Sequence, residues 1–177
     1  MICYHFVSRK VWRQIKKDGF LKPNTKLLLL KNINQLHKRY RMNNKEYKEI
    51  RSFTKRLPRN KFIVAIPKKK IKSWISSGLM GEIKHFLKPD YRLEFNVPRN
   101  CKIFIREHIY QSPKEINERY NKKMYIFVPE PLKTKIWVKY FKSTRILRSA
   151  NNLKNIKVPE VWLACKIPFD KIKIIKV

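Results

Sequence analysis

The first twenty residues change from one hydrophobic pattern to another. Residues 2–7 are mostly apolar and predict a β-strand. Ser8 follows as a candidate N-cap, and Trp12 and Ile15 then share one face of a short helix. Gly19 stands where that helix should end, because glycine adopts the left-handed conformation of a helix C-terminus without steric cost. The chain therefore begins with a predicted strand and an amphipathic helix.

A second helical region follows. The apolar run Lys26–Leu30 predicts a buried strand or the start of the next helix, and residues 32–57 predict two consecutive helices. Asn43 is a candidate cap of the second helix, with Glu46 three residues later as in a capping box. One face of this helix is apolar and consists of Tyr47, Ile50, Phe53 and Leu57. Its opposite face is basic.

The rest of the chain contains two segments with a similar order of predicted elements. The first has a strand 62–66, a basic helix around Trp74, and strands 92–97 and 102–106; the second has a strand 125–128, a basic helix around Trp137, and strands 161–167 and 172–176. A helix is predicted over 113–121, between the two segments. Either the segments are a duplicated strand–helix–strand–strand unit, or two stretches of similar composition resemble each other by chance.

These elements predict a mixed α+β fold, with one or more strand-rich sheets flanked by basic helices. The length suits a single compact domain, 1–177. Within it we distinguish a possible N-terminal part, 1–60, and possible repeat units 61–109 and 124–177.

The charge of the chain is unusual. It has 44 Lys and Arg against 12 Asp and Glu, a formal net charge of +32. The excess is spread along the chain, with +14 in residues 1–60, +7 in 61–110 and +11 in 111–177. Solubility needs a net charge of only about 2–8 in a small domain. The charge therefore predicts a polyanionic partner, with nucleic acid as the first choice and an anionic membrane surface as the second.

Three basic segments are candidates for contact with phosphates. The first and third place cations along a helix face beside aromatic residues, where they can meet successive phosphates. The second places lysines at the positive end of a helix dipole, where a bound phosphate would relieve their repulsion. The first is the second predicted helix and its approach: Lys38, Arg39, Arg41, Lys45, Lys48, Arg51, Lys55 and Arg56. The second is Lys68, Lys69 and Lys70 at a helix start, and the third is Lys133, Lys135, Lys139, Arg145 and Arg148 around Trp137. The alternative for each is a solvated surface, and for Trp137 a place in the core.

Several classes of protein are excluded by what the sequence lacks. Three glycines are too few for a Walker loop or a dinucleotide-binding loop. The four histidines have no metal-binding spacing, so no metal site and no bound cofactor are expected from the motifs. No apolar run approaches the length of a membrane-spanning helix. We expect Cys3, Cys101 and Cys165 to be reduced core residues of an intracellular protein, cytoplasmic or nucleoid-associated.

The N-terminus resembles one known family. Tyr4-His5-Phe6-x-Ser8, followed by Trp12, Ile15, Gly19 and Pro23, is similar to the first strand and helix of ADP-ribosyltransferase-like domains. Relatives in that family include DNA-modifying toxin transferases and RNA 2′-phosphotransferases. The resemblance implies a split-sheet fold, NAD as ligand, and His5 as the catalytic residue that contacts the NAD ribose. It covers about twenty residues, and no glutamate stands in the family's Q-x-E or E-x-E context.

The sequence thus leads to three functional hypotheses. The first is a nucleic-acid-binding protein, for RNA or DNA, that contacts mainly phosphates through its basic surface. The second is an NAD-dependent ADP-ribosyltransferase-like enzyme acting on nucleic acid or a protein. The third is a structural component of a ribonucleoprotein or nucleoprotein particle. Without the family resemblance, His5 is an ordinary, partly buried strand histidine.

Overall fold

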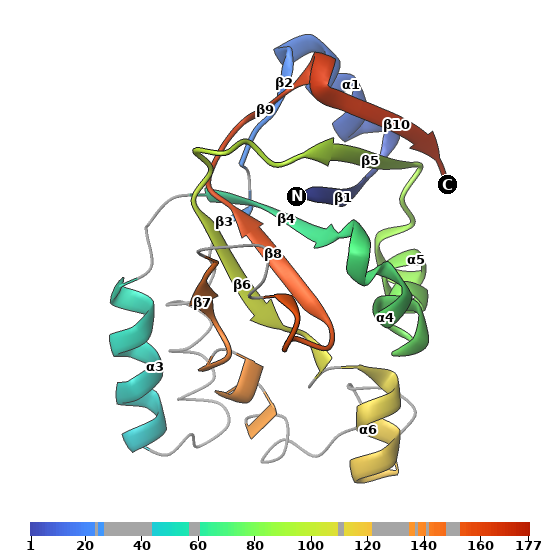
Figure 1. Cartoon of the computed structure of the whole chain (residues 1–177). Helices are drawn as coiled ribbons and strands as arrows, with labels where there is room; N and C mark the ends of the chain where they lie inside the picture. Colours follow the sequence, from blue (N-terminus) through green and yellow to red (C-terminus); the bar gives the residue numbers. More distant parts are fainter. Residues whose placement is uncertain are drawn as a thin grey trace.

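The computed structural model describes residues 1–23, 25–26, 44–56, 61–109, 112–121, 135–136, 138–140, 142–147 and 153–177. Figure 1 shows the arrangement of its helices and strands. In chain order these are β1 (Ile2–Val7), α1 (Arg9–Asp18), β2 (Phe20–Leu21), β3 (Thr25–Lys26), α3 (Asn44–Arg56), β4 (Lys61–Pro67), η1 (Lys68–Lys70), α4 (Ile71–Ser76), α5 (Leu79–Leu87), β5 (Tyr91–Asn96), β6 (Ile103–Glu107), α6 (Pro113–Tyr120), β7 (Arg145–Ile146), β8 (Pro159–Leu163), β9 (Ile167–Pro168), η5 (Phe169–Lys171) and β10 (Ile172–Lys176). This is an α+β protein, as the sequence predicts.

The N-terminal strand and helix form as predicted. The Ser8 hydroxyl accepts a hydrogen bond from the Val11 backbone N–H at 3.4 Å and caps α1. Gly19 ends the helix with φ of 73°, in the left-handed region. The apolar face of α1 is buried, and its Trp12 ring stacks on Phe169 of η5 at 5.2 Å between centroids. Local capping and one apolar face therefore determine this element.

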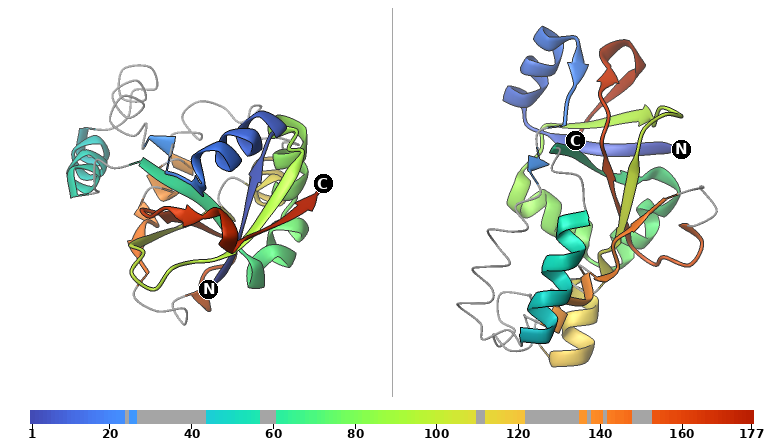
Figure 2. Two further views of the ribbon diagram at one scale, coloured as in Figure 1. Left: turned by 90° about the horizontal axis from the view of Figure 1, so that it is seen from above. Right: turned by 90° about the vertical axis from the view of Figure 1, so that its left-hand side faces the viewer.

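The main sheet is antiparallel and has the strand order β10-β5-β1-β4-β8-β6-β7, with β3 also paired to β4. The two central strands are joined over a short length. β1 pairs with β5 along all six of its residues but with β4 only at Cys3 and Tyr4. Beyond Tyr4 the two strands diverge, so the sheet has a first half, β10-β5-β1, and a second half, β4-β8-β6-β7. The views in Figure 1 and Figure 2 show the strands of the two halves running in different directions.

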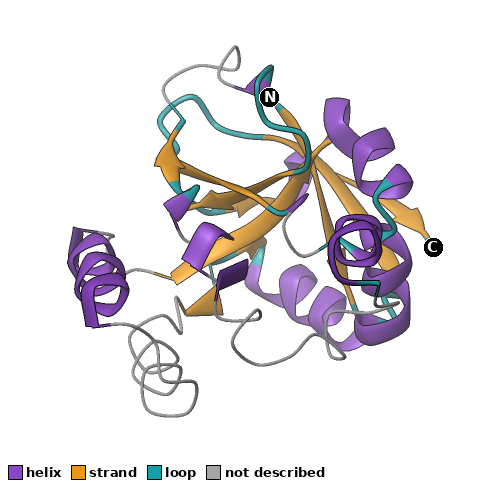
Figure 3. Ribbon diagram, turned by 90° about the horizontal axis from the view of Figure 1, so that it is seen from below, coloured by secondary structure: helices purple, strands orange, loops and turns teal. Residues whose placement is uncertain are grey.

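Helices cover the sheet on different sides. The main core joins α1 to the inward residues of both halves, including Leu93 of β5 and Val161 of β8, which are fully buried. A smaller cluster packs Trp74 of α4 and Leu79 of α5 against Ile66 of β4. Figure 3 shows these helices beside the strands. The point where the sheet divides therefore lies between α1 on one side and α4 and α5 on the other.

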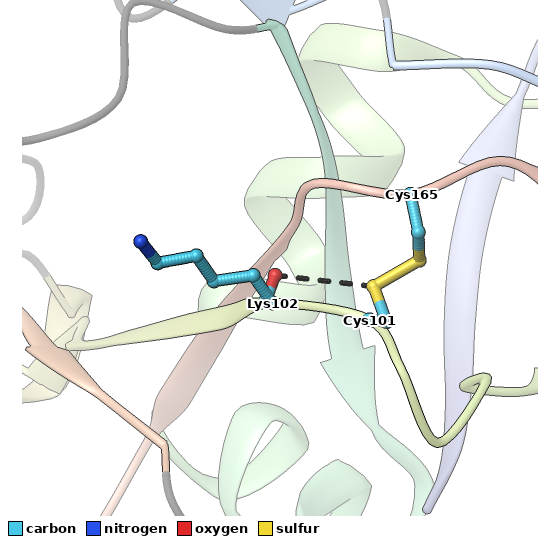
Figure 4. The surroundings of a disulfide bond; sticks show 3 residues. All are labelled: Cys101, Lys102 and Cys165. Carbon is cyan, nitrogen blue, oxygen red and sulfur yellow. Dashed lines mark hydrogen bonds between the residues drawn. A yellow bond between two sulfur atoms is a disulfide. The ribbon is translucent and has the colours of Figure 1, made fainter.

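A disulfide joins two of the connections that cross between the halves of the sheet. Residues 97–102 lead from β5 to β6, and residues 164–171 lead from β8 back to β10. Cys101 and Cys165 lie on these connections with Cα atoms 5.3 Å apart, and Figure 4 shows the bond between them. The expectation of three reduced cysteines is therefore wrong for this pair. It failed because the β6–β8 ladder, which pairs Ile103 with Leu163, brings the two residues opposite each other.

The predicted strands 62–66, 92–97, 102–106 and 172–176 correspond to β4, β5, β6 and β10 within one residue. The predicted strand 161–167 is wrong in extent, because β8 ends at Leu163 where the chain leaves for the other half. The helix around Trp74 is divided into η1, α4 and α5, with Gly78 at φ of 82° between the last two. The strand 125–128 and Trp137 lie outside the described residues. In the described part of the chain, no helix is long and apolar enough to cross a membrane.

Candidate active-site cavity

His5 lies where the two central strands diverge. Its Nδ1 donates a hydrogen bond to the Val64 carbonyl oxygen of β4 at 2.7 Å. Because a carbonyl oxygen only accepts, Nδ1 carries the proton, and in the neutral ring Nε2 is then an acceptor. Burial lowers the pKa of His5, and the bond to Val64 offsets part of that effect. The side chain thus links β1 to β4 beyond the last pair of their ladder, and its Nε2 is not used by this bond.

A cavity of about 630 Å³ opens at this divergence. Its lining comes from β1, β4, the start of α1, α4, α5, the residue after β6 and the start of β8. The volume lies within the usual range for small-molecule sites, roughly 300–1,000 Å³. Most of the lining is apolar, and its polar side chains include His5, His108, Glu82 and Glu160. A few polar groups in a mainly apolar cavity are typical of a ligand site.

Glu160 of β8 is the buried carboxylate of this cavity. Its Oε2 accepts hydrogen bonds from the Tyr140 hydroxyl and from Trp162 Nε1, the latter at 2.8 Å. Its Oε1 faces His108 Nδ1 at 3.8 Å, too far for a hydrogen bond. Burial alone would raise the pKa of Glu160, but His108, the Tyr140 hydroxyl and the Arg106 guanidinium lower it to about 2. Glu160 is therefore ionised at neutral pH, with Oε1 left for another donor.

Arg106 and Glu107 hold the carboxylate in place from β6. Arg106 lies opposite Glu160 in the β6–β8 ladder and is 2% exposed. Its guanidinium lies 4.3 Å from the Trp162 ring centroid, and its Nε donates to the Thr144 hydroxyl at 2.8 Å. Glu107 accepts three backbone N–H bonds, of which two come from residues 157 and 158, just before β8. The start of β8, and with it Glu160, is fixed by a buried polar network.

Glu82 of α5 adds a second carboxyl group to the cavity wall. Burial raises the pKa of Glu82, and the nearby His108 ring offsets part of that effect. Two carboxyl groups whose environments shift their pKa in opposite directions are a common feature of sites that combine charge stabilisation with proton transfer. The described residues contain no cluster of His, Cys, Asp and Glu suited to a metal ion.

Two of the three predicted basic segments lie together. The carboxylate of Glu49 on α3 is 2.5 Å from Nζ of Lys142, which stands between Lys139 and Arg145 of the third segment. This ion pair joins the helix to the third segment. Side chains from both segments are exposed to solvent: Lys45, Lys48, Arg51, Lys135, Lys139 and Arg145. The positions of Lys38, Arg39, Arg41, Lys133 and Arg148 lie outside the described residues, as do the side chains of Lys55 and Arg56.

The second predicted segment, Lys68–Lys70, is divided in its contacts. Lys68 Nζ forms an ion pair with both carboxylate oxygens of Glu94, at 3.0 and 3.1 Å. Lys69 is exposed, whereas Lys70 donates to the Ile156 carbonyl oxygen at 2.8 Å. Three consecutive lysines therefore have three different environments, which the sequence alone does not distinguish.

The sequence identified His5 but did not select Glu160. Glu160 stands just before the predicted strand 161–167, but the sequence gives no means of placing it in one cavity with a histidine from the other end of the chain. The available signal was the position of Glu160 directly after Pro159, where the strand begins. Comparison with family models, with curated proteins and with solved structures finds no match for this chain.

Proposed function

We propose that the protein binds nucleic acid and is an NAD-dependent ADP-ribosyltransferase-like enzyme, with the cavity between β1 and β4 as its active site. The observation that carries this proposal is that His5 and Glu160 line one cavity at the division of the sheet. His5 is the residue that the N-terminal resemblance marks as the NAD contact. The resemblance also implies a split sheet, and the divergence after Tyr4 supports that implication.

The residues of the cavity suit this chemistry. NAD supplies an ADP-ribosyl group when its nicotinamide–ribose bond breaks, and positive charge develops on the ribose as it does so. The ionised Glu160 presents Oε1 in a largely apolar cavity, where a fixed negative charge stabilises developing positive charge strongly. His5 Nε2 can accept a hydrogen bond from a ribose hydroxyl. Phe86 and Leu87 line the cavity and are 59% and 62% exposed, so they can cover a bound ligand and exclude water.

The acidic residues are too few to neutralise the basic ones, which supports nucleic acid as the partner of the chain. Several of the few carboxylates already pair with cations, as Asp18 does with Lys22 and Glu94 with Lys68. The net charge of +32 therefore remains as an excess of surface cations. Binding a polyanion would release its condensed counterions and relieve the self-repulsion of the protein.

The enzymatic part is tested by release of nicotinamide from NAD with the purified full chain. We expect Glu160→Gln to lower the rate roughly a hundredfold or more, because the charge that stabilises the transition state is lost. Glu94→Gln is the matched control, since Glu94 is also a strand glutamate but pairs with Lys68 instead of lining the cavity. Equal rates for wild type and Glu160→Gln would refute this assignment.

Two substitutions of His5 separate its structural role from its ligand role. The amide of His5→Asn can keep the hydrogen bond to the Val64 carbonyl, but it lacks the atom that corresponds to Nε2. We expect this variant to fold normally but to bind NAD weakly. His5→Ala should lose both the hydrogen bond to Val64 and the contact with NAD. Full activity of His5→Asn would reduce His5 to a structural histidine.

The binding part is tested by fluorescence anisotropy with labelled duplex DNA, single-stranded DNA and hairpin RNA, with heparin as competitor. If about six phosphates are neutralised, affinity should fall by about three decades between 50 and 200 mM salt. A steep salt dependence with one preferred nucleic acid would support the proposal. Absence of binding at the lower salt concentration would contradict it.

A further inference from the structure

A second cavity, of about 480 Å³, is lined by four lysines. Lys70 comes from η1, Lys114 from α6, and Lys154 and Lys157 from the segment before β8. This cavity and the His5–Glu160 cavity share α4 as a wall. Trp74 faces the His5–Glu160 cavity, while serines of the same helix face the lysines.

Three of the four lysines are not paired with a carboxylate of any described residue. Lys154 and Lys157 are exposed and form no ion pair with any described residue. Among the described residues, Lys70 Nζ binds a backbone carbonyl, that of Ile156, which carries no net charge.

Two carboxylates line the α6 side of the cavity, but each has a cation of its own. Glu115 is paired with Arg119, and Glu118 lies 3.9 Å from Lys114. An uncompensated positive region therefore remains on the side formed by Lys70, Lys154 and Lys157.

We propose that this lysine-lined cavity binds phosphate groups of a polynucleotide strand. A lysine ammonium is a compact charge that suits phosphate oxygens, and three of them converge here from two segments far apart in the chain. None of the described lining residues is aromatic, so the cavity offers no stacking surface for bases. It recognises the backbone, without sequence preference. This inference rests on the nucleic-acid part of the proposed function and gives it a location.

The location has a consequence for the neighbouring cavity. A strand whose phosphates occupy the lysine-lined cavity passes beside α4, whose Trp74 borders the His5–Glu160 cavity. The lysines therefore act as positioning residues for a polynucleotide, and they are not required for contact with NAD.

The test compares the double variant Lys154→Gln/Lys157→Gln with Lys16→Gln/Lys17→Gln. Both variants remove two exposed lysines, but the second pair lies at the end of α1, away from the cavity. The probes are labelled single-stranded DNA, single-stranded RNA of the same sequence, and tripolyphosphate as competitor. We expect the first variant to bind both strands on the order of tenfold more weakly and to have a salt slope shallower by about 1.4, the loss of two phosphate contacts. The control should keep the wild-type slope.

Nicotinamide release without nucleic acid provides a second readout, and it should be unchanged in both variants. If the two variants weaken strand binding equally, the cavity is not a specific site, although nucleic-acid binding by the protein stands. If wild type binds no strand, the inference and the binding part of the proposed function both fail. A third outcome would also overturn the inference: tripolyphosphate displaces the labelled strand, but Lys154→Gln/Lys157→Gln binds the strand as tightly as wild type does. The ligand would then be a small phosphorylated molecule instead of a polynucleotide.

Discussion

Reduction of the disulfide between Cys101 and Cys165 should destabilise the protein substantially. The bond closes a loop of 64 positions, and the loop-closure relation gives about 4 kcal/mol for a loop of this length. In a chain of this size, that loss corresponds to a fall in Tm of roughly 8–16 °C. With a urea m-value of about 2 kcal/mol/M, the unfolding midpoint should fall by about 2 M.

The measurement is urea unfolding with and without a phosphine reductant, followed by tryptophan fluorescence. The control is the double variant Cys101→Ala/Cys165→Ala, whose midpoint should be low and insensitive to the reductant. In the folded protein Cys3 does not exchange with the disulfide, because it is buried and its burial raises the pKa of the thiol to about 12.

A count of free thiols in denaturant decides the matter independently. We expect one thiol, that of Cys3, without reductant and three after reduction. Three thiols in the purified, unreduced protein would refute the bond. If the protein has one thiol but its urea midpoint does not change on reduction, the expected loss of unfolding free energy would be refuted, since the closed loop would then add nothing to the stability.

Two other perturbations should change the free energy of unfolding in directions that follow from the structure. The pKa of Glu160 is lowered from 4.5 to about 2 in the folded protein. Its charge therefore stabilises the fold at pH values above its pKa in the unfolded chain, and this contribution disappears as pH falls from about 4.5 through 2. The difference in unfolding free energy between wild type and Glu160→Gln should therefore shrink over that range, by roughly 3 kcal/mol, in urea titrations; a constant difference would contradict it. Gly78→Ala should destabilise by about 1–2 kcal/mol, because φ is +82° and the new Cβ would lie 3.1 Å from Pro113. Gly81→Ala lies inside α5, and its new Cβ would have no atom within 4 Å. It should be neutral or stabilising by up to about 1 kcal/mol, and equal effects of the two substitutions would refute this reasoning.

The elements with local signals were predictable from the sequence. Ser8 and Gly19 define the ends of α1, and hydrophobic runs ended by proline give β4 and β5 nearly to the residue. Strand order has no such signal, because hydrophobic alternation does not show which strand is the neighbour of which. The division of the sheet after Tyr4 therefore appears only in the structure.

The same limit explains what was and was not predictable about the candidate site. His5 was found through a resemblance of about twenty residues that a single segment can carry. Glu160 becomes meaningful only when β8 is placed beside β4, and Lys70 only when residues 154–157 are placed beside η1. Cys101 and Cys165 were misread because their proximity is a product of the β6–β8 pairing.

The candidate site is formed by both halves of the sheet, and this links its geometry to the disulfide. His5 belongs to the first half and Glu160 to the second, while β1 and β4 pair directly at only two positions. The disulfide between Cys101 and Cys165 adds a covalent link between two of the connections that join the halves. If the relative position of the halves sets the distance between the imidazole and the carboxylate, reduction should weaken NAD binding under conditions where the fold still persists. A thermodynamic effect without any effect on ligand affinity would mean that the two residues are held in place without the disulfide, His5 by its hydrogen bond across the division to Val64 and Glu160 by its contacts with Arg106 and Tyr140.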